Sequence, residues 1–311
     1  MGERDKIKQN EYSVSIMRGL QPSRTAEYMA LFRAVETAGP ADRRLFDDPY
    51  AALLLSGTLK TVARIACMPI AGRLVRAILD FGWPYTRSSG VVRTRLIDDL
   101  VRDGIRDGAE QLLLLGAGFD SRAYRLGEAK GIAVFEVDHP ATQRVKRERL
   151  KALFGQSPAN VCFVEVDFEK DDLEDKLIEA GFDSKKSTVV VWEGVVSYLT
   201  ESAVHGTLAV LARLLAPGSH LILTYMHKGA LDGSGTFKGA RRWKSWVRFS
   251  GEPFIFGFDP ANLAEALRPL GFLLKNDVST EEAARHYCGP IDRDECGSEA
   301  YRVATAIRAG E

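Results

Sequence analysis

The chain has 311 residues, of which 45% are hydrophobic, so it is long enough to bury a large core. Its 42 basic residues balance 42 acidic ones, which argues against a global attraction to nucleic acid or to an anionic membrane. The polar start MGERDKIKQNEYSVS lacks the apolar centre of a signal peptide, and charged residues interrupt the most apolar N-terminal stretch, 58–83. We therefore expect a cytoplasmic protein with no membrane-spanning helix and no nucleic-acid or membrane partner.

Residues 23–105 are predicted to be helical, because apolar side chains recur at spacings of three and four residues. Proline-containing pairs at 39–40, 48–49, 68–69 and 83–84 punctuate these helices. This pattern predicts a helical N-terminal cap, which we place at 1–92.

From residue 111 onward, short β-branched or leucine-rich runs alternate with amphipathic segments. This alternation is typical of a parallel sheet covered by helices on both faces. The predicted strands are 111–115, 132–137, 161–166, 188–192 and 220–225, with 272–274 and 301–307 as later candidates. The predicted helices between them are 143–154, 173–180 and 203–215. The sequence thus predicts an α/β domain at 93–311.

The segment 229–260 stands apart, because it combines glycines with basic and aromatic residues. Long loops often carry function, so this segment is interpreted as a cover over a substrate site. A second interpretation is a surface excursion in which Trp243, Trp246 and Val247 pack at helical spacing. A nucleic-acid platform is a weaker third interpretation, since the basic residues cluster here alone.

Functional residue types follow the predicted strands. Gly116, Ala117 and Gly118 follow the first strand, whereas Asp138, Asp167 and Glu193 follow the next three. Ligands of open α/β sheets bind at the carboxyl ends of the strands, so we expect these residues at one site. Asp138 lies 20 positions after Gly118, the separation at which an acid reaches the hydroxyls of a ribose. Glycine lets a cofactor approach the backbone closely.

Two residues of the loop argue against a cofactor that carries phosphate. Ser121 stands where the third glycine of a dinucleotide motif would lie, and Asp120 would face the pyrophosphate. Two like charges about 4 Å apart repel by roughly 4 kcal/mol at an effective dielectric constant of about 20. S-adenosylmethionine keeps the adenosine and replaces the phosphates with a sulfonium and an amino acid group. Arg93 is a suitable donor for its carboxylate, although Arg93 could instead pair with Asp98 or Asp99.

The other acids also have two interpretations. Asp167 and Phe168 suit an adenine ring, whereas Asp167 could instead cap a helix that begins near Asp171. Glu193 lies in the apolar stretch VVVWEGVVSYL, so a cofactor or a nearby arginine must satisfy it, and we favour the cofactor. No metal is expected, because the four cysteines form no CxxC pair and the five histidines form no HxxxH.

Several motifs resemble the leucine carboxyl methyltransferase family, from about residue 23 to 225. They are SRTAEYMALFRAVE, LFDDPYA, VVRTR, LLLLGAGFDSRAYRL, FEVDHP, VEVDFEKDD, WEGVVSYLTESA and APGSHLIL. The resemblance implies a class I methyltransferase (Rossmann-like) fold, S-adenosylmethionine as the cofactor and methyl transfer to oxygen. The segment 229–260 departs from the family, so the resemblance does not give the acceptor.

The resemblance also implies roles for single residues. By motif, Arg93 looks like the residue that binds the cofactor carboxylate, and Arg33 looks like a basic N-terminal contact. Gly116, with Ala117 and Gly118, resembles the glycine loop, and Asp138 resembles the ribose acid. Asp167 and Phe168 resemble the adenine contacts, and Glu193 the acid near the methionine part. Tyr198 matches a tyrosine near the transferred methyl group, although it could instead pack beneath the helix that follows.

These observations predict an O-methyltransferase that acts on a small molecule, a carboxylate or phenol of polyketide type. The alternatives are a protein C-terminal carboxyl methyltransferase, a nicotinamide-dependent oxidoreductase and a binding module without turnover. A carboxylate acceptor requires no base, whereas a phenol or alcohol does. His139, His227 and Tyr225 lie near predicted strand ends and are the candidate bases.

Overall fold

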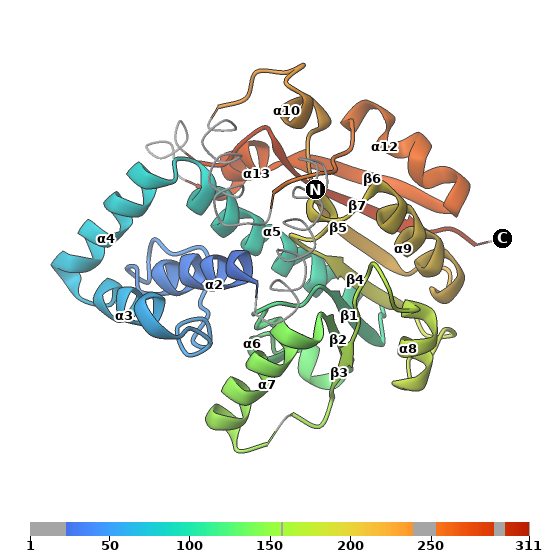
Figure 1. Cartoon of the computed structure of the whole chain (residues 1–311), viewed down its shortest axis with the longest axis horizontal. Helices are drawn as coiled ribbons and strands as arrows, with labels where there is room; N and C mark the ends of the chain where they lie inside the picture. The colour runs from blue at the N-terminus through green and yellow to red at the C-terminus, as the bar shows by residue number, and fades with distance from the viewer. Residues whose placement is uncertain (1–22, 157, 239–252, 289–295, 311) are drawn as a thin grey trace, which may run out of the picture.

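A seven-stranded sheet forms the centre of this computed structural model, which describes residues 23–156, 158–238, 253–288 and 296–310 (Figure 1). The strand order is β3-β2-β1-β4-β5-β7-β6. The strands are β1 (Gln111–Leu115), β2 (Ala133–Asp138), β3 (Val161–Glu165), β4 (Thr188–Trp192), β5 (His220–Met226), β6 (Phe272–Ser279) and β7 (Tyr301–Arg308). β1 to β5 are parallel, and β7 runs antiparallel to both β5 and β6. The predicted mostly parallel sheet is confirmed, including its two late strands.

Helices cover both faces of the sheet, which explains why its central strands are apolar throughout. Every residue of β1 and β4 is buried. One face packs against α5 (Thr86–Arg106), α6 (Arg122–Arg125) and α7 (Pro140–Phe154). The other packs against α8 (Leu173–Glu179), α9 (Glu201–Leu214) and α12 (Pro260–Leu267). α13 (Thr280–Tyr287) packs on α5. The three helices predicted between strands are confirmed, and α7 starts three residues early because Pro140 occupies its first turn.

The N-terminal cap consists of α2 (Arg24–Thr37), α3 (Gly57–Ala66) and α4 (Pro69–Gly82), followed by α5. Leu31 and Val35 of α2 share one buried core with Leu112 and Leu114 of β1. The boundary drawn between 92 and 93 lies inside α5, because that helix continues from the cap onto the sheet. α3 and α4 form the left edge of the molecule in Figure 1.

Two parts of the segment 229–260 belong to the described residues, 229–238 and 253–260. α10 (Lys228–Asp232) starts the segment, and a parallel bridge joins His227 to Phe258 at its other end. Trp243, Trp246 and Val247, for which packing was predicted, lie outside the described residues. Among the described helices, none has the length and apolar character needed to cross a membrane.

Candidate active site

A cavity of about 400 Å³ lies at the carboxyl ends of β1, β2 and β4, with α2 on its opposite side. This volume falls within the usual range for small-molecule sites, about 300–1,000 Å³. All ten residues predicted for the site line it: Arg33, Arg93, Gly116, Ala117, Gly118, Asp138, Asp167, Phe168, Glu193 and Tyr198. The structure therefore brings together residues that lie as far apart as 33 and 198 in the sequence.

The turn after β1 depends on its glycines. Gly116 and Gly118 have φ angles of 66° and 45°, in the left-handed region that side chains disfavour. A Cβ at Gly116 would collide with the side chain of Val195. Glycine at 116 therefore lets the backbone line the cavity, because a larger residue would disfavour the turn and would also collide with Val195.

We expect Gly116→Ala to destabilise the protein by at least about 1 kcal/mol more than Gly181→Ala. Gly181 also has a positive φ, 88°, but nothing lies within 4 Å of its Cβ position, so the pair of variants isolates the collision with Val195. Urea denaturation measures both free energies of unfolding. Equal losses would show that the φ angle alone makes glycine necessary at 116.

Asp138 joins the end of β2 to this turn. Its carboxylate accepts hydrogen bonds from the backbone N–H groups of Gly118 and of His139, the latter at 2.6 Å. Burial raises the pKa of Asp138 above its ordinary value, against the effect of these two donors. A carboxylate has about four lone-pair sites, so two donors leave acceptor capacity for a ligand.

A buried arginine that sequence reasoning missed holds two acids of the cavity. Arg122, on α6, has a side chain only 2% exposed. Its Nη1 lies 2.5 Å from both Asp120 Oδ2 and Glu193 Oε2, and its Nε donates to Asp98 Oδ1 at 2.8 Å. The need of buried Glu193 for a cation, together with the two arginines of FDSRAYRL, was the signal that could have identified it.

The alternative interpretation of Arg93 and the favoured interpretation of Glu193 both change. Arg93 does not pair with Asp98 or Asp99, because its Nε donates to Glu193 Oε1 at 2.7 Å. Glu193 was expected to be satisfied mainly by the cofactor, but each of its oxygens accepts from an arginine. Both Arg93 and Glu193 nevertheless line the cavity.

The negative charge of Asp120 also has a positively charged partner nearby. Burial works to raise the pKa of Asp120 and of Glu193, but the neighbouring cations, with Arg122 the strongest of them, together outweigh burial, and both pKa values lie below the ordinary range. Because Arg122 neutralises Asp120, the repulsion of about 4 kcal/mol expected for a phosphate near a bare carboxylate is an overestimate. Asp120 thus gives a weaker argument against phosphate than the sequence suggested.

An acid of the motif LFDDPYA holds the side chain of Arg33 in position. Asp48 of this motif is buried and accepts from Arg33 Nε at 2.8 Å and from Ser121 Oγ at 2.6 Å. Arg33 Nη2 also donates to the backbone oxygen of Phe119 at 2.5 Å. Asp48 therefore fixes Arg33 against the loop that follows β1.

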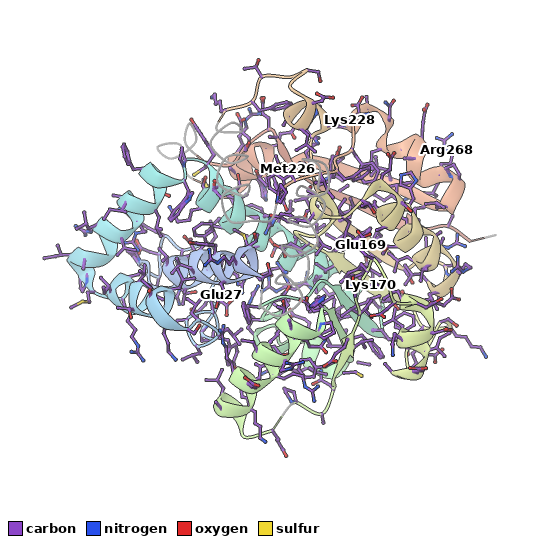
Figure 2. The ribbon with its side chains drawn as sticks, viewed as in Figure 1. Glu27, Glu169, Lys170, Met226, Lys228 and Arg268 are labelled. Atoms are coloured by element: carbon purple, nitrogen blue, oxygen red, sulfur yellow. The ribbon has the colours of Figure 1, made fainter. Side chains whose placement is uncertain are left out.

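Asp167 and Phe168 follow β3 on another wall of the cavity. The alternative that Asp167 caps the next helix is wrong, because α8 begins at Leu173 and Asp172 caps it through the N–H of Glu174 at 2.9 Å. Glu169 lies beside them near the start of α9, with its carboxylate 3.3 Å from Thr200 Oγ1 (Figure 2).

Aromatic side chains line the part of the cavity around Tyr198. The Tyr198 ring lies 5.1 Å from the ring of Phe254, and Tyr301 and Met29 line the same cavity. The N–H of Ile255 donates to the backbone oxygen of Ser197 at 2.8 Å, which ties residues 253–255 to the cavity wall. The described end of the segment 229–260 therefore contributes to the site.

Two of the three candidate bases are wrong. Tyr225 and His227 do not line the cavity: the Tyr225 hydroxyl donates to Asp277 at 2.7 Å, and His227 caps α10. His139 does line it, and its Nδ1 accepts from the N–H of Ala141 at 3.3 Å. Among the described residues, no cluster of three or more His, Cys, Asp or Glu side chains could hold a metal ion.

Comparisons with known proteins agree with this geometry. Residues 26–212 match the sequence model of the family described as leucine carboxyl methyltransferase. A protein of Mycolicibacterium smegmatis, named "Putative S-adenosyl-L-methionine-dependent methyltransferase", is 34% identical over 84% of this chain and 87% of its own length. A protein of Mycolicibacterium gilvum with the same name is 28% identical over 91% of this chain and 94% of its own.

A solved structure supports the fold. The crystal structure of a protein from Thermobifida fusca, described as a "putative methyltransferase", superposes with a TM-score of 0.58. The match covers 84% of this chain and 93% of that chain at 19% identity, so it speaks for the fold alone. With more than half of its length matched by the family model, the chain belongs to the leucine carboxyl methyltransferase family.

Proposed function

We propose that this enzyme transfers the methyl group of S-adenosylmethionine to an oxygen of a small-molecule acceptor, a carboxylate or phenol of polyketide type. The chain is an S-adenosylmethionine-dependent methyltransferase, as its family and its named relatives indicate. The choice of oxygen and of a small acceptor is the further step: oxygen rests on the carboxyl methyltransferase family, and a small acceptor rests on the lining of the cavity.

The observation that carries the proposal is that one cavity is lined by acids and arginines that together suit each part of S-adenosylmethionine. Asp138 suits the ribose hydroxyls, and Asp167 with Phe168 suits the adenine. Arg33 and Arg93 suit the carboxylate of the methionine part. Glu193 and Asp120, each held by Arg122, suit its ammonium group and the positive charge on sulfur. Bound there, the cofactor supplies a methyl carbon attached to a positively charged sulfur.

The residues around Tyr198 would bind and position the methyl acceptor. Methyl transfer requires alignment of the acceptor oxygen with the methyl carbon and exclusion of water. Tyr198 and Phe254 form an aromatic part of the lining, and Met29 adds apolar lining to the same cavity, which suits an aromatic or aliphatic acceptor. A carboxylate acceptor would need no base, whereas a phenol would, and of the three bases predicted from the sequence His139 alone lines the cavity.

The proposal is tested in two stages with the full chain. Calorimetric titration with S-adenosylmethionine should show binding, and titration with NADH should show none. A screen of aromatic and aliphatic acids, phenols and C-terminal peptides then measures release of S-adenosylhomocysteine. Turnover of a small acid or phenol supports the proposal. Turnover of peptides alone would replace it with protein carboxyl methylation, and binding without any turnover would leave a binding module.

Tyr198→Phe should lower kcat/KM for the acceptor by about tenfold, the effect of losing one hydrogen bond in the transition state, while cofactor affinity stays unchanged. The matched control is Tyr287→Phe, since the Tyr287 hydroxyl donates to Asp99 outside the cavity. A loss of cofactor affinity instead of kcat/KM would assign Tyr198 to the donor side of the cavity.

A further inference from the structure

The outer face of α4 is apolar although nothing in the described structure covers it. Ile70, Leu74, Ile78 and Phe81 follow one another at spacings of four, four and three residues, so they share one face of the helix. Their exposed fractions are 86%, 62%, 58% and 84%. Gly72 and Leu79, on the opposite side, are buried. A helix that is apolar on both sides is typically covered on both.

This face belongs to a larger surface at the edge of the cap, formed by α3 and α4 (Figure 1). Most of the exposed large apolar side chains in the described ranges belong to α3, α4 or the residues next to them: Leu53 before α3, Ile65 on α3, Met68 between the helices, and Ile70, Leu74, Ile78 and Phe81 on α4. Exposed apolar side chains gathered on neighbouring helices are typical of an interaction site. We call these seven residues the cap patch.

The charges around the cap patch are positive. Lys60 and Arg64 lie on α3 and Arg73 lies on α4, whereas the Nη1 of Arg76 is buried on the inner side of that helix. Within the described part of the chain, no carboxylate lies within ion-pair distance of Lys60, Arg64 or Arg73. Asp80, the one acid of these two helices, pairs with Arg87 at 2.7 Å. The zero net charge of the whole chain therefore hides a local excess of positive charge.

We propose that the cap patch binds the surface of an anionic lipid bilayer. Apolar side chains on one face of a helix, flanked by arginines, are the pattern of helices that lie in the headgroup region. Anionic headgroups supply the negative charge that the surroundings of the patch lack. Two copies packed through this face would instead bring like charges together without an acid between them. The expectation of no membrane partner rested on the net charge of the chain and on the charged residues that interrupt 58–83, whereas this inference concerns binding to the surface of a bilayer without spanning it.

Co-sedimentation of the full chain with vesicles tests this inference. Vesicles of phosphatidylcholine mixed with phosphatidylglycerol should bind the protein at least about tenfold more tightly than vesicles of phosphatidylcholine alone. The paired variants Ile78→Ser and Ile178→Ser separate the patch from general hydrophobicity, because the two isoleucines are 58% and 55% exposed on helices. Ile78→Ser combined with Phe81→Ser should weaken binding about tenfold or more, and Ile178→Ser should not.

The charges are tested in the same assay. Arg73→Gln should weaken binding to the anionic vesicles, whereas Lys185→Gln, an exposed cation far from the patch in sequence, should not. Unchanged binding of S-adenosylmethionine confirms that each variant is folded. Equal sedimentation of wild type and the Ile78 and Phe81 double variant would overturn the inference, as would no binding to either vesicle. A wild-type dimer that Ile78→Ser converts to a monomer, without vesicle binding, would assign the patch to a second copy.

Discussion

Arg122→Met should lower the free energy of unfolding by about 3–5 kcal/mol, the usual effect of removing one partner from a buried ion pair. Methionine approximates the length and apolar stem of arginine, so the change mainly removes the charge. It leaves Asp120 and Glu193 in the cavity wall without their shared cation, and it removes one of the two arginines that hold fully buried Asp98. Urea denaturation followed by circular dichroism measures the loss.

Arg106→Met is the matched control for this prediction. Arg106 also pairs with an acid, Asp103 at 2.8 Å, but its side chain is 64% exposed. Exposed pairs of this kind contribute about 0–1 kcal/mol, so the control should change stability little. Similar losses in the two variants would show that the buried network around Arg122 does not stabilise the fold.

The dependence of this loss on pH has a definite sign. Burial opposes ionisation of Asp120 and Glu193, but Arg122, the strongest of the neighbouring cations, together with the others holds their pKa values below the ordinary values of the unfolded chain. An acid with a lowered pKa adds stability above its unfolded pKa, about 4, and this contribution disappears as the pH falls towards the folded value. The difference between wild type and Arg122→Met should therefore be largest near neutral pH and should shrink below about pH 4. A difference that grows in acid would contradict the assignment.

The central strands could be predicted from the sequence because helices cover both of their faces. Continuous apolar runs such as LLLL and VVV then mark the strands directly. β6 was harder, and only its first three residues were predicted. It lies at the edge of the sheet, and its middle carries the polar residues Lys275, Asn276 and Asp277, which remain partly or fully exposed. An edge strand loses the apolar signal because one side of it meets solvent.

The candidate site could be predicted in part for a related reason. The carboxyl ends of parallel strands lie at the same edge of the sheet. Acids that follow β2, β3 and β4 must therefore lie near one another, whatever conformation their loops adopt. The partners of Arg93 did not follow from this rule. Asp98 lies five residues further along α5, and residues at that spacing face different directions on a helix. Arg93 consequently faces Glu193, whereas Asp98 faces Arg122 and Arg125.

Arg122 and Asp48 were missed because their roles come from contacts between distant segments. Asp48 joins the cap to the loop after β1, across 73 residues to Ser121. Arg122 joins α6 to Glu193, across 71 residues. The motifs LFDDPYA and FDSRAYRL can be recognised in the sequence, but only the structure shows which charged side chains pair with Asp48 and with Arg122. Buried acids in a predicted site therefore call for a search for buried cations in the same motifs.

Asp138→Ala should weaken binding of S-adenosylmethionine about tenfold to a hundredfold, as expected for loss of a charged hydrogen bond of about 1.5–3 kcal/mol. Asp138 acts in two ways. Its carboxylate can accept from the ribose hydroxyls, and it also holds the N–H groups of Gly118 and His139, so that the turn after β1 keeps its shape. Calorimetric titration measures the dissociation constant.

Asp138→Asn and Glu165→Ala make this prediction specific. Asparagine keeps one acceptor oxygen for the backbone but removes the charge, so a loss nearly as large in Asp138→Asn would mean that the charged contact to the ribose dominates. Glu165 ends the neighbouring strand directly opposite Asp138, but it does not line the cavity. Its alanine variant should therefore bind the cofactor as the wild type does. If Asp138→Ala leaves the dissociation constant unchanged, the ribose lies elsewhere, and the acid at the end of β2 serves only to hold the glycine turn.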